Sequence, residues 1–348
     1  MYSLPLVEEL TRLSGKRAPI DAAEALRIVE LAEEVFAGIP EKIVKQFRPC
    51  FPLDLLAALM VERANALRIL GRRKAARLAF RGVFALANAG SQDTLLIARI
   101  AYLAGSHYMG RGKYRAASKA LSLAAGIYGE LEEEHRLGET QLKQAALLYD
   151  LDFLEEAIKA QTEALANLDE LAEPVTALAA YSNLAEMMQR AGDTTSALQA
   201  LTDSQHLAED LKGTRAQGVW FWVRGRCRIA SGTTLDGSGD LLDAWRILEP
   251  LQDTYSLGLV GVDLCRYYLE RCKLEQLEHW IGPTVRALEL HAPSPLVVRE
   301  LAKLEESVKR MTLDAAQVGH VLELVVKTMG QRNRRGKPGR DAENAPPE

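Results

Sequence analysis

A chain of 348 residues exceeds the usual single domain, so either two globular domains or one extended array of repeats must be considered. Hydrophobic residues make up 48% of the sequence and charged residues 26%, with a net charge of −4. This balance excludes a disordered chain. The sequence starts without a secretory signal and contains no apolar run near the roughly 20 residues that span a bilayer, so we expect a cytoplasmic protein without membrane contact.

The predicted elements begin with N-terminal capping helices within residues 1–54. Residues 21–36 and 41–47 show helical spacing of apolar side chains and predict an opening helical pair. Asp21 suits the N-cap of the first of these helices, and Glu24 suits the third position of a capping box.

Residues 55–290 predict an array of about six helical hairpins. No proline occurs between Pro52 and Pro174, so glycine, aspartate and asparagine must make the turns there. A turn position returns every 40 or 41 residues, at Gly71, Gly112, Asp152, Gly192, Gly232 and Cys272.

Small residues flank these turns at fixed distances. Seven residues before the turns stand Ala64, Gly105, Ala145, Ala185, Gly225 and Cys265, and five residues after the first four turns stand Ala76, Ala117, Ala157 and Ala197. Small side chains let two antiparallel helices approach closely, and one hairpin cannot bury its apolar face alone. Stacked hairpins, and therefore a solenoid, are the predicted result.

Two departures from the repeat predict looser packing. Residues 233–240, Thr-Thr-Leu-Asp-Gly-Ser-Gly-Asp, follow Gly232 and predict a lengthened turn before the next helix. In the sixth unit, Leu277 replaces the alanine that follows the turn.

The chain is predicted to end in two capping helices and a tail. Residues 296–311 and 314–329 show helical periodicity and form the cap, within residues 291–330. Residues 331–348 are polar, basic and poor in apolar side chains, and predict a disordered tail.

The repeat resembles the tetratricopeptide (TPR) family in its order of small residue, aromatic residue, turn and alanine, as in the unit from Gly105 to Ala117. Phe80 and Leu121 stand at the large apolar position that follows. The spacing of about 40 residues resembles long-helix variants of bacterial regulatory and signalling proteins. The resemblance implies an all-α, right-handed superhelical solenoid whose first helices line a concave groove.

Such a groove binds a peptide or a protein surface without bond chemistry, so the expected function is a scaffold, an adaptor or a regulatory sensor. The sequence has no phosphate-binding loop, zinc-protease motif or nucleophile elbow, and its six histidines are scattered. We therefore expect no catalytic residues, no metal and no cofactor.

Projection from the turns selects the residues that would face this groove. They are Asn65, Tyr102, Ser106, Lys143, Tyr149, Asn183, Glu186, Gln189, Trp222, Arg226, Asp263 and Arg266. Trp222 is chosen over its neighbour Trp220, although the pattern leaves open which of the two faces the groove. Arg226 and Arg266 occupy equivalent positions in successive units, which suits a partner with acidic groups.

Charge is distributed unevenly along the array. Residues 63–119 carry a net charge of +11 and residues 130–186 carry −11. The densest basic patch comprises Arg63, Arg68, Arg72, Arg73, Lys74, Arg77 and Arg81.

Three interpretations of the basic patch stay open: a solvated helix face, a surface for an acidic protein, and a surface for nucleic acid. The alternative function is thus a nucleic-acid-associated regulatory factor that uses residues 63–119 and the tail. Opposite charges on neighbouring repeats also predict weak, salt-sensitive self-association.

Overall fold

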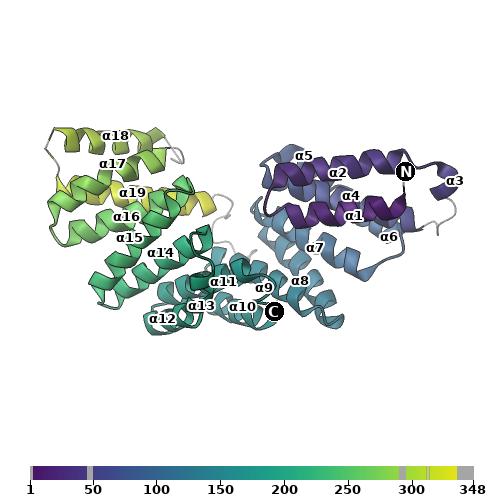
Figure 1. The fold of residues 1–348 in the computed structure, drawn as a ribbon, viewed down its shortest axis with the longest axis horizontal. Helices are drawn as coiled ribbons and strands as arrows, with labels where there is room; N and C mark the ends of the chain where they lie inside the picture. The colour runs from purple at the N-terminus through teal and green to yellow at the C-terminus, as the bar shows by residue number, and fades with distance from the viewer. Residues whose placement is uncertain (1–2, 45–49, 290–294, 311, 313, 335–348) are drawn as a thin grey trace. The chain divides into compact units, whose positions relative to one another are not determined.

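The computed structural model describes residues 3–44, 50–289, 295–310, 312 and 314–334, and every regular element in them is an α-helix (Figure 1). The all-α prediction is confirmed. The helices form two compact units, and the division falls inside one helix, between Leu147 and Leu148.

The helices of the first unit are α1 (Leu4–Arg17), α2 (Ala22–Ala37), α3 (Glu41–Val44), α4 (Cys50–Ile69), α5 (Arg73–Ala79), α6 (Val83–Ala89), α7 (Thr94–Met109), α8 (Tyr114–Glu130) and most of α9 (Glu134–Asp150). Those of the second unit are the end of α9, α10 (Leu154–Asn167), α11 (Pro174–Arg190), α12 (Thr194–Asp203), α13 (Gln205–Asp210), α14 (Arg215–Ala230), α15 (Thr234–Leu248), α16 (Thr254–Glu270), α17 (Leu274–Glu289), α18 (Pro295–Lys309) and α19 (Ala315–Arg334). None of the described helices is both long and apolar enough to cross a membrane.

All six predicted turn residues have the left-handed backbone conformation that ends a helix. Their φ angles are 72° at Gly71, 67° at Gly112, 73° at Asp152, 91° at Gly192, 92° at Gly232 and 53° at Cys272. In the second turn, Gly112 N donates to Met109 O at 2.9 Å and Lys113 N donates to Tyr108 O at 3.0 Å. This Schellman pairing satisfies the last carbonyls of α7 and lets the chain reverse into α8.

The small residues predicted to flank the turns are buried in every unit. A Cβ atom on Gly105 would lie 2.6 Å from Leu121 Cδ2, so the close approach of α7 and α8 requires a glycine there.

Two cysteines of the second unit are buried. Cys265 of α16 stands at the small-residue position that Gly105 occupies in α7, and Cys227 lies in α14. Burial raises the pKa of the Cys227 thiol to about 11 and that of Cys265 to about 12, so both stay protonated at neutral pH.

The lengthened turn predicted after Gly232 is wrong. Helix α15 begins at Thr234, and Gly237 takes the position that alanine occupies in the first four units. Gly237 packs directly against Gly225 of α14, because a Cβ atom on either glycine would lie within 2.8 Å of the other's carbonyl oxygen. The glycines that suggested a loop are thus needed for a close contact between two helices. The sixth unit is also well packed, since Leu277 is fully buried.

The opening pair differs from the prediction. Helix α2 begins after Asp21 as expected, and the Asp21 carboxylate accepts hydrogen bonds from the backbone N–H groups of Ala23 and Glu24, each at 2.9 Å. Its packing partner is α1, which the sequence analysis did not predict (Figure 1). The predicted second helix, residues 41–47, is the single turn α3 as far as the structure describes it, and residues 45–49 lie outside the described part.

The predicted closing pair corresponds to α18 and α19. Helix α19 continues to Arg334, so the first four residues of the predicted disordered tail are helical. Residues 335–348 lie outside the described part of the chain. The apolar faces of α18 and α19 bury Val297, Leu301, Val318 and Val325 against α16 and α17.

Candidate functional site

Four of the predicted groove residues come together in the second unit, on three successive first helices of the hairpins. Glu186 lies on α11, Trp222 and Arg226 on α14, and Asp263 on α16, and we refer to these four as the Trp222 cluster. Trp222 Nε1 donates to Asp263 Oδ2 at 2.7 Å. The Arg226 guanidinium lies 3.5 Å from Glu186 Oε1 and 3.8 Å from Asp263 Oδ2, and 5.7 Å from the centre of the Trp222 ring.

These contacts determine the charge of the cluster. Burial alone would lower the pKa of Arg226, but the charges of Asp263 and Glu186 outweigh it and raise the pKa. Arg226 therefore stays protonated between two carboxylates of its own chain. An acidic partner would have to compete with Asp263 and Glu186 for Arg226, which the sequence analysis did not anticipate.

The two tryptophans of α14 differ in burial. Trp220 is only 1% exposed, and its Nε1 donates to Ser204 Oγ at 2.9 Å inside the core. Trp222 is partly exposed and uses its indole N–H on the surface of the first helices. Its ring is thus partly accessible, and the hydrogen bond to Asp263 fixes the orientation of the ring.

The remaining predicted residues of the second unit lie on α9, α11 and α16. Arg266 of α16 is exposed and has no carboxylate partner among the described residues. Asn183 of α11 is exposed, and Gln189 is partly buried. Tyr149, at the end of α9, stacks under the guanidinium of Arg190 at 4.9 Å.

Arg190 belongs to this surface but was not predicted. It forms an ion pair with Asp152, the residue of the third turn. The available signal was its spacing of four residues from Glu186, which places both on one face of α11.

In the first unit, the predicted residues are Asn65 of α4, Tyr102 and Ser106 of α7, and Lys143 of α9. Asn65 is buried, and its Oδ1 accepts two hydrogen bonds from the Arg68 guanidinium, at 2.8 and 3.2 Å. Tyr102, Ser106 and Lys143 are partly buried. Asn65 therefore orients an arginine and is not itself accessible to a partner.

An ion pair that the sequence analysis missed lies on the same helices. Arg99 of α7 donates to both carboxylate oxygens of Glu62 on α4, at 2.8 and 3.2 Å. The side chain of Glu62 is 8% exposed, so this bidentate pair links two neighbouring first helices from within the fold.

The structure separates the predicted basic patch into two groups. Arg63 and Arg68 lie on α4, where Arg63 pairs with Glu33 at 2.9 Å and Arg68 is held by Asn65. The other five residues are exposed in and around α5: Arg72, Arg73, Lys74, Arg77 and Arg81. The patch is therefore not one helix face, and Arg68 contacts a predicted groove residue, Asn65.

Neither the models of known protein families nor the sequences of characterised proteins match this chain. Solved structures share its fold. A Rap protein complexed with Competence and Sporulation Factor is 13% identical, with a TM-score of 0.62 over 94% of this chain and 88% of that one. The Rap conjugation gene regulator of the plasmid pLS20, in complex with the Phr* peptide, is 12% identical, with a TM-score of 0.54 over 97% of this chain and 99% of that one.

Aspartyl phosphate phosphatase F from Bacillus subtilis is also similar, at 11% identity and a TM-score of 0.56 over 99% of this chain and 97% of that one. At such identities the likeness shows the fold alone. It confirms the predicted fold, a solenoid of TPR-like helical hairpins.

Proposed function

We propose that this chain is a non-catalytic interaction module of the bacterial cytoplasm, acting as a scaffold, an adaptor or a regulatory sensor. It binds a peptide segment or a protein surface on the first helices of its hairpins. The residues that carry binding in the second unit are those of the Trp222 cluster, together with Arg266.

The observation that carries this proposal is the preorganisation of the Trp222 cluster. Trp222 and Arg226 are held by carboxylates of the two neighbouring first helices, Asp263 and Glu186, so they lose little conformational freedom on binding. Tryptophan and arginine are also the side chains most enriched among residues that dominate binding energy. A half-buried aromatic ring beside fixed charges suits an extended peptide with both apolar and polar groups.

Proteins of the same fold support a binding role. One similar structure is a complex with Competence and Sporulation Factor and another is a complex with the Phr* peptide. The similar phosphatase has the same fold, so the proposal of a non-catalytic role rests on the site itself. In the Trp222 cluster, the charged groups are paired with one another and are not arranged as a nucleophile beside a base.

Affinity capture with a matched variant tests the proposal. Wild type and Trp222→Ala are immobilised and exposed to a native bacterial lysate, and the bound proteins are identified by mass spectrometry. Segments of a protein that binds wild type alone are then synthesised and titrated by fluorescence anisotropy. A partner retained equally by both proteins would contradict a role for the Trp222 cluster.

Arg266→Ala is expected to weaken binding of that partner by about 1–3 kcal/mol, because an exposed arginine contributes directed hydrogen bonds to an acidic group. The free energy of unfolding should change by less than about 0.5 kcal/mol, since Arg266 is exposed and has no carboxylate partner among the described residues. Arg246→Ala is the matched control, as Arg246 is exposed on the second helix α15 and contacts Asp243. Equal affinities of the two variants would exclude Arg266 from the binding surface.

A second candidate function is nucleic-acid association, favoured by the exposed cations of two neighbouring repeats. In addition to the five residues around α5, Arg111, Lys113, Arg115 and Lys119 are exposed at the second turn and on α8. A hollow of about 390 Å³ at the start of α8 is lined in part by Lys113, Arg115 and Lys119.

Salt titration distinguishes this function from the first. Phosphate contacts would give a steep, log-linear loss of affinity for a DNA or RNA oligonucleotide with rising salt. Replacing Arg72, Arg73 and Lys74 by glutamate would abolish this binding.

The same triple variant tests self-association in sedimentation experiments at low salt. Low salt is needed because exposed charge pairs are weak and easily screened.

A further inference from the structure

The second helices of the first two repeats, α5 and α8, carry exposed cations that no carboxylate neutralises. We refer to nine exposed residues in and around these helices, none of which has a carboxylate partner among the described residues, as the basic strip: Arg72, Arg73, Lys74, Arg77, Arg81, Arg111, Lys113, Arg115 and Lys119. Asp93 is the only acidic residue from 63 to 129, and its carboxylate caps α7. By contrast, two arginines on first helices of the same unit, Arg63 and Arg99, are each paired with a glutamate.

The basic strip extends over equivalent positions of two successive repeats. The first, third and seventh positions after the turn residues Gly71 and Gly112 are exposed in both repeats. These positions hold Arg72 and Lys113, Lys74 and Arg115, and Leu78 and Lys119. Stacked repeats turn equivalent positions to the same side of the array, because each repeat is related to the next by a small rotation. The strip therefore lies on the side formed by the second helices. Three of its cations also line the hollow at the start of α8.

One exposed leucine lies beside the cations on each helix. Leu78 of α5 is 58% exposed and follows Lys74 by four residues. Leu123 of α8 is 45% exposed and follows Lys119 by four residues. Residues four apart share one face of a helix, so each leucine and its lysine reach the solvent together. A partner that covers this surface must accommodate apolar side chains as well as positive charges.

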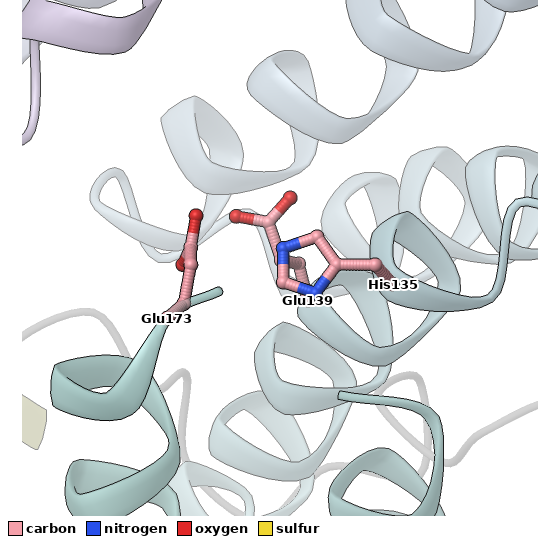
Figure 2. Close-up of side chains that lie close together, drawn as sticks. All are labelled: His135, Glu139 and Glu173. Carbon is pink, nitrogen blue, oxygen red and sulfur yellow. The ribbon is translucent and has the colours of Figure 1, made fainter. Parts of the chain in front are cut away.

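The basic strip ends where α9 begins. Glu130, Glu132 and Glu134 are exposed just before α9 and at its first residue. Figure 2 shows Glu139 and His135 further along α9, where a carboxylate oxygen and a ring nitrogen of the two lie within 4.8 Å. An anionic partner is repelled by the carboxylates of this segment. Its contact is therefore limited to α5 and α8.

The side chains around the cations distinguish between anionic partners. Proteins that bind single-stranded nucleic acid stack its bases on aromatic rings, but no aromatic side chain of residues 70–129 is exposed. The phosphate backbone of a duplex offers no apolar surface to Leu78 and Leu123. An anionic bilayer suits both kinds of side chain, because its headgroups attract lysine and arginine and its acyl chains take up leucine.

We propose that the basic strip, together with Leu78 and Leu123, docks the first unit on the surface of an anionic lipid bilayer. The contact is peripheral and needs no spanning helix. It thus differs from the sequence-based expectation of no membrane contact, which considered only a secretory signal and apolar runs long enough to span a bilayer. The docking is separate from the proposed function, because it uses second helices and leaves the first helices free to bind a peptide.

Flotation with lipid vesicles tests the docking. Wild type is mixed with vesicles of phosphatidylcholine alone, or of phosphatidylcholine and phosphatidylglycerol in a two-to-one ratio, and the floated protein is measured. We expect wild type to float with the anionic vesicles only. Replacing Arg72, Arg73 and Lys74 by glutamate should abolish this binding, because the electrostatic attraction is lost. The double variant Leu78→Ser, Leu123→Ser should bind about tenfold more weakly, because it lacks the apolar part of the contact.

Leu31→Ser is the matched control for the double variant. Leu31 is 48% exposed on α2 in the same unit, but its neighbours Glu30 and Glu34 are acidic. This variant should bind the anionic vesicles like wild type. All the replaced residues are exposed, so every variant should keep the melting temperature of wild type, which circular dichroism checks.

Three results would overturn the proposal. The first is a wild type that does not float with the anionic vesicles, and the second is a leucine double variant that binds them as tightly as wild type. The third comes from a parallel titration with a labelled DNA duplex. A duplex that binds wild type and the leucine double variant equally, with no binding to vesicles, would assign the strip to nucleic acid. Capture of a peptide partner through Trp222 is measured separately and depends on none of these results.

Discussion

Gly237→Ala is expected to lower the free energy of unfolding by about 3 kcal/mol, although alanine favours helices more than glycine does. The new Cβ atom would lie 2.7 Å from the carbonyl oxygen of Gly225 and 2.9 Å from the backbone nitrogen of Ile229. Backbone atoms cannot move aside as the end of a side chain can. Helices α14 and α15 would have to separate along their whole contact.

Urea denaturation followed by circular dichroism measures this effect, and the same helix provides the control. Gly239 also lies in α15, but a Cβ atom there would meet nothing within 4 Å. Gly239→Ala should therefore stabilise the protein, by about 0.5–1 kcal/mol, through helix propensity alone. Stabilisation of both variants would contradict the close contact between Gly225 and Gly237.

Asp240→Ala is expected to cost about 3–5 kcal/mol, because it leaves two arginines without their shared counter-ion. The Asp240 side chain is 5% exposed and accepts from Arg224 at 2.6 and 3.0 Å and from Arg228 at 2.9 Å. Arg224 cannot turn to solvent easily, because its guanidinium stacks 4.2 Å from the centre of the Trp220 ring.

Asp243→Ala is the control for this prediction. Asp243 lies one turn further along α15 and pairs with Arg246, and both side chains are exposed, at 44% and 74%. Such surface pairs contribute less than about 1 kcal/mol. Similar losses of stability for Asp240→Ala and Asp243→Ala in urea denaturation would show that the buried pair is no more important than a surface pair.

The turns of the array were predictable because one backbone geometry recurs in them. A left-handed residue is needed after each first helix, and the regular spacing identified it even where the residue is Asp152 or Cys272 and not glycine. Helix α1 was missed because it lies outside the repeat. Its start depends on Ser3, whose hydroxyl accepts from Leu6 N, a local cap that the apolar spacing does not reveal.

The contact between α14 and α15 could not be predicted from local preference. Three turn-forming residue types within residues 233–240 favour a loop, but Gly237 faces another glycine, and close helix packing outweighs its low helix propensity. The sequence indicates this close helix contact only when Gly225 and Gly237 are considered as a pair.

The members of the Trp222 cluster were predicted as groove residues, but their mutual contacts were not. The register of the turns places Glu186, Arg226 and Asp263 on equivalent faces. Whether Arg226 reaches a ligand or its own carboxylates depends on the distance between neighbouring helices, which the sequence does not contain. In the first unit, likewise, the sequence could not show that Asn65 holds Arg68.

The buried thiols allow local opening of the second unit to be measured by cysteine alkylation. Cys227 and Cys265 report on α14 and α16, and each can react with an alkylating reagent only when its helical pair opens. Cys272 is exposed at the sixth turn and provides an internal reference for the reagent. Peptide-resolved mass spectrometry of a labelling time course would then give a separate opening rate for each helical pair, and so show whether neighbouring repeats open one at a time or together.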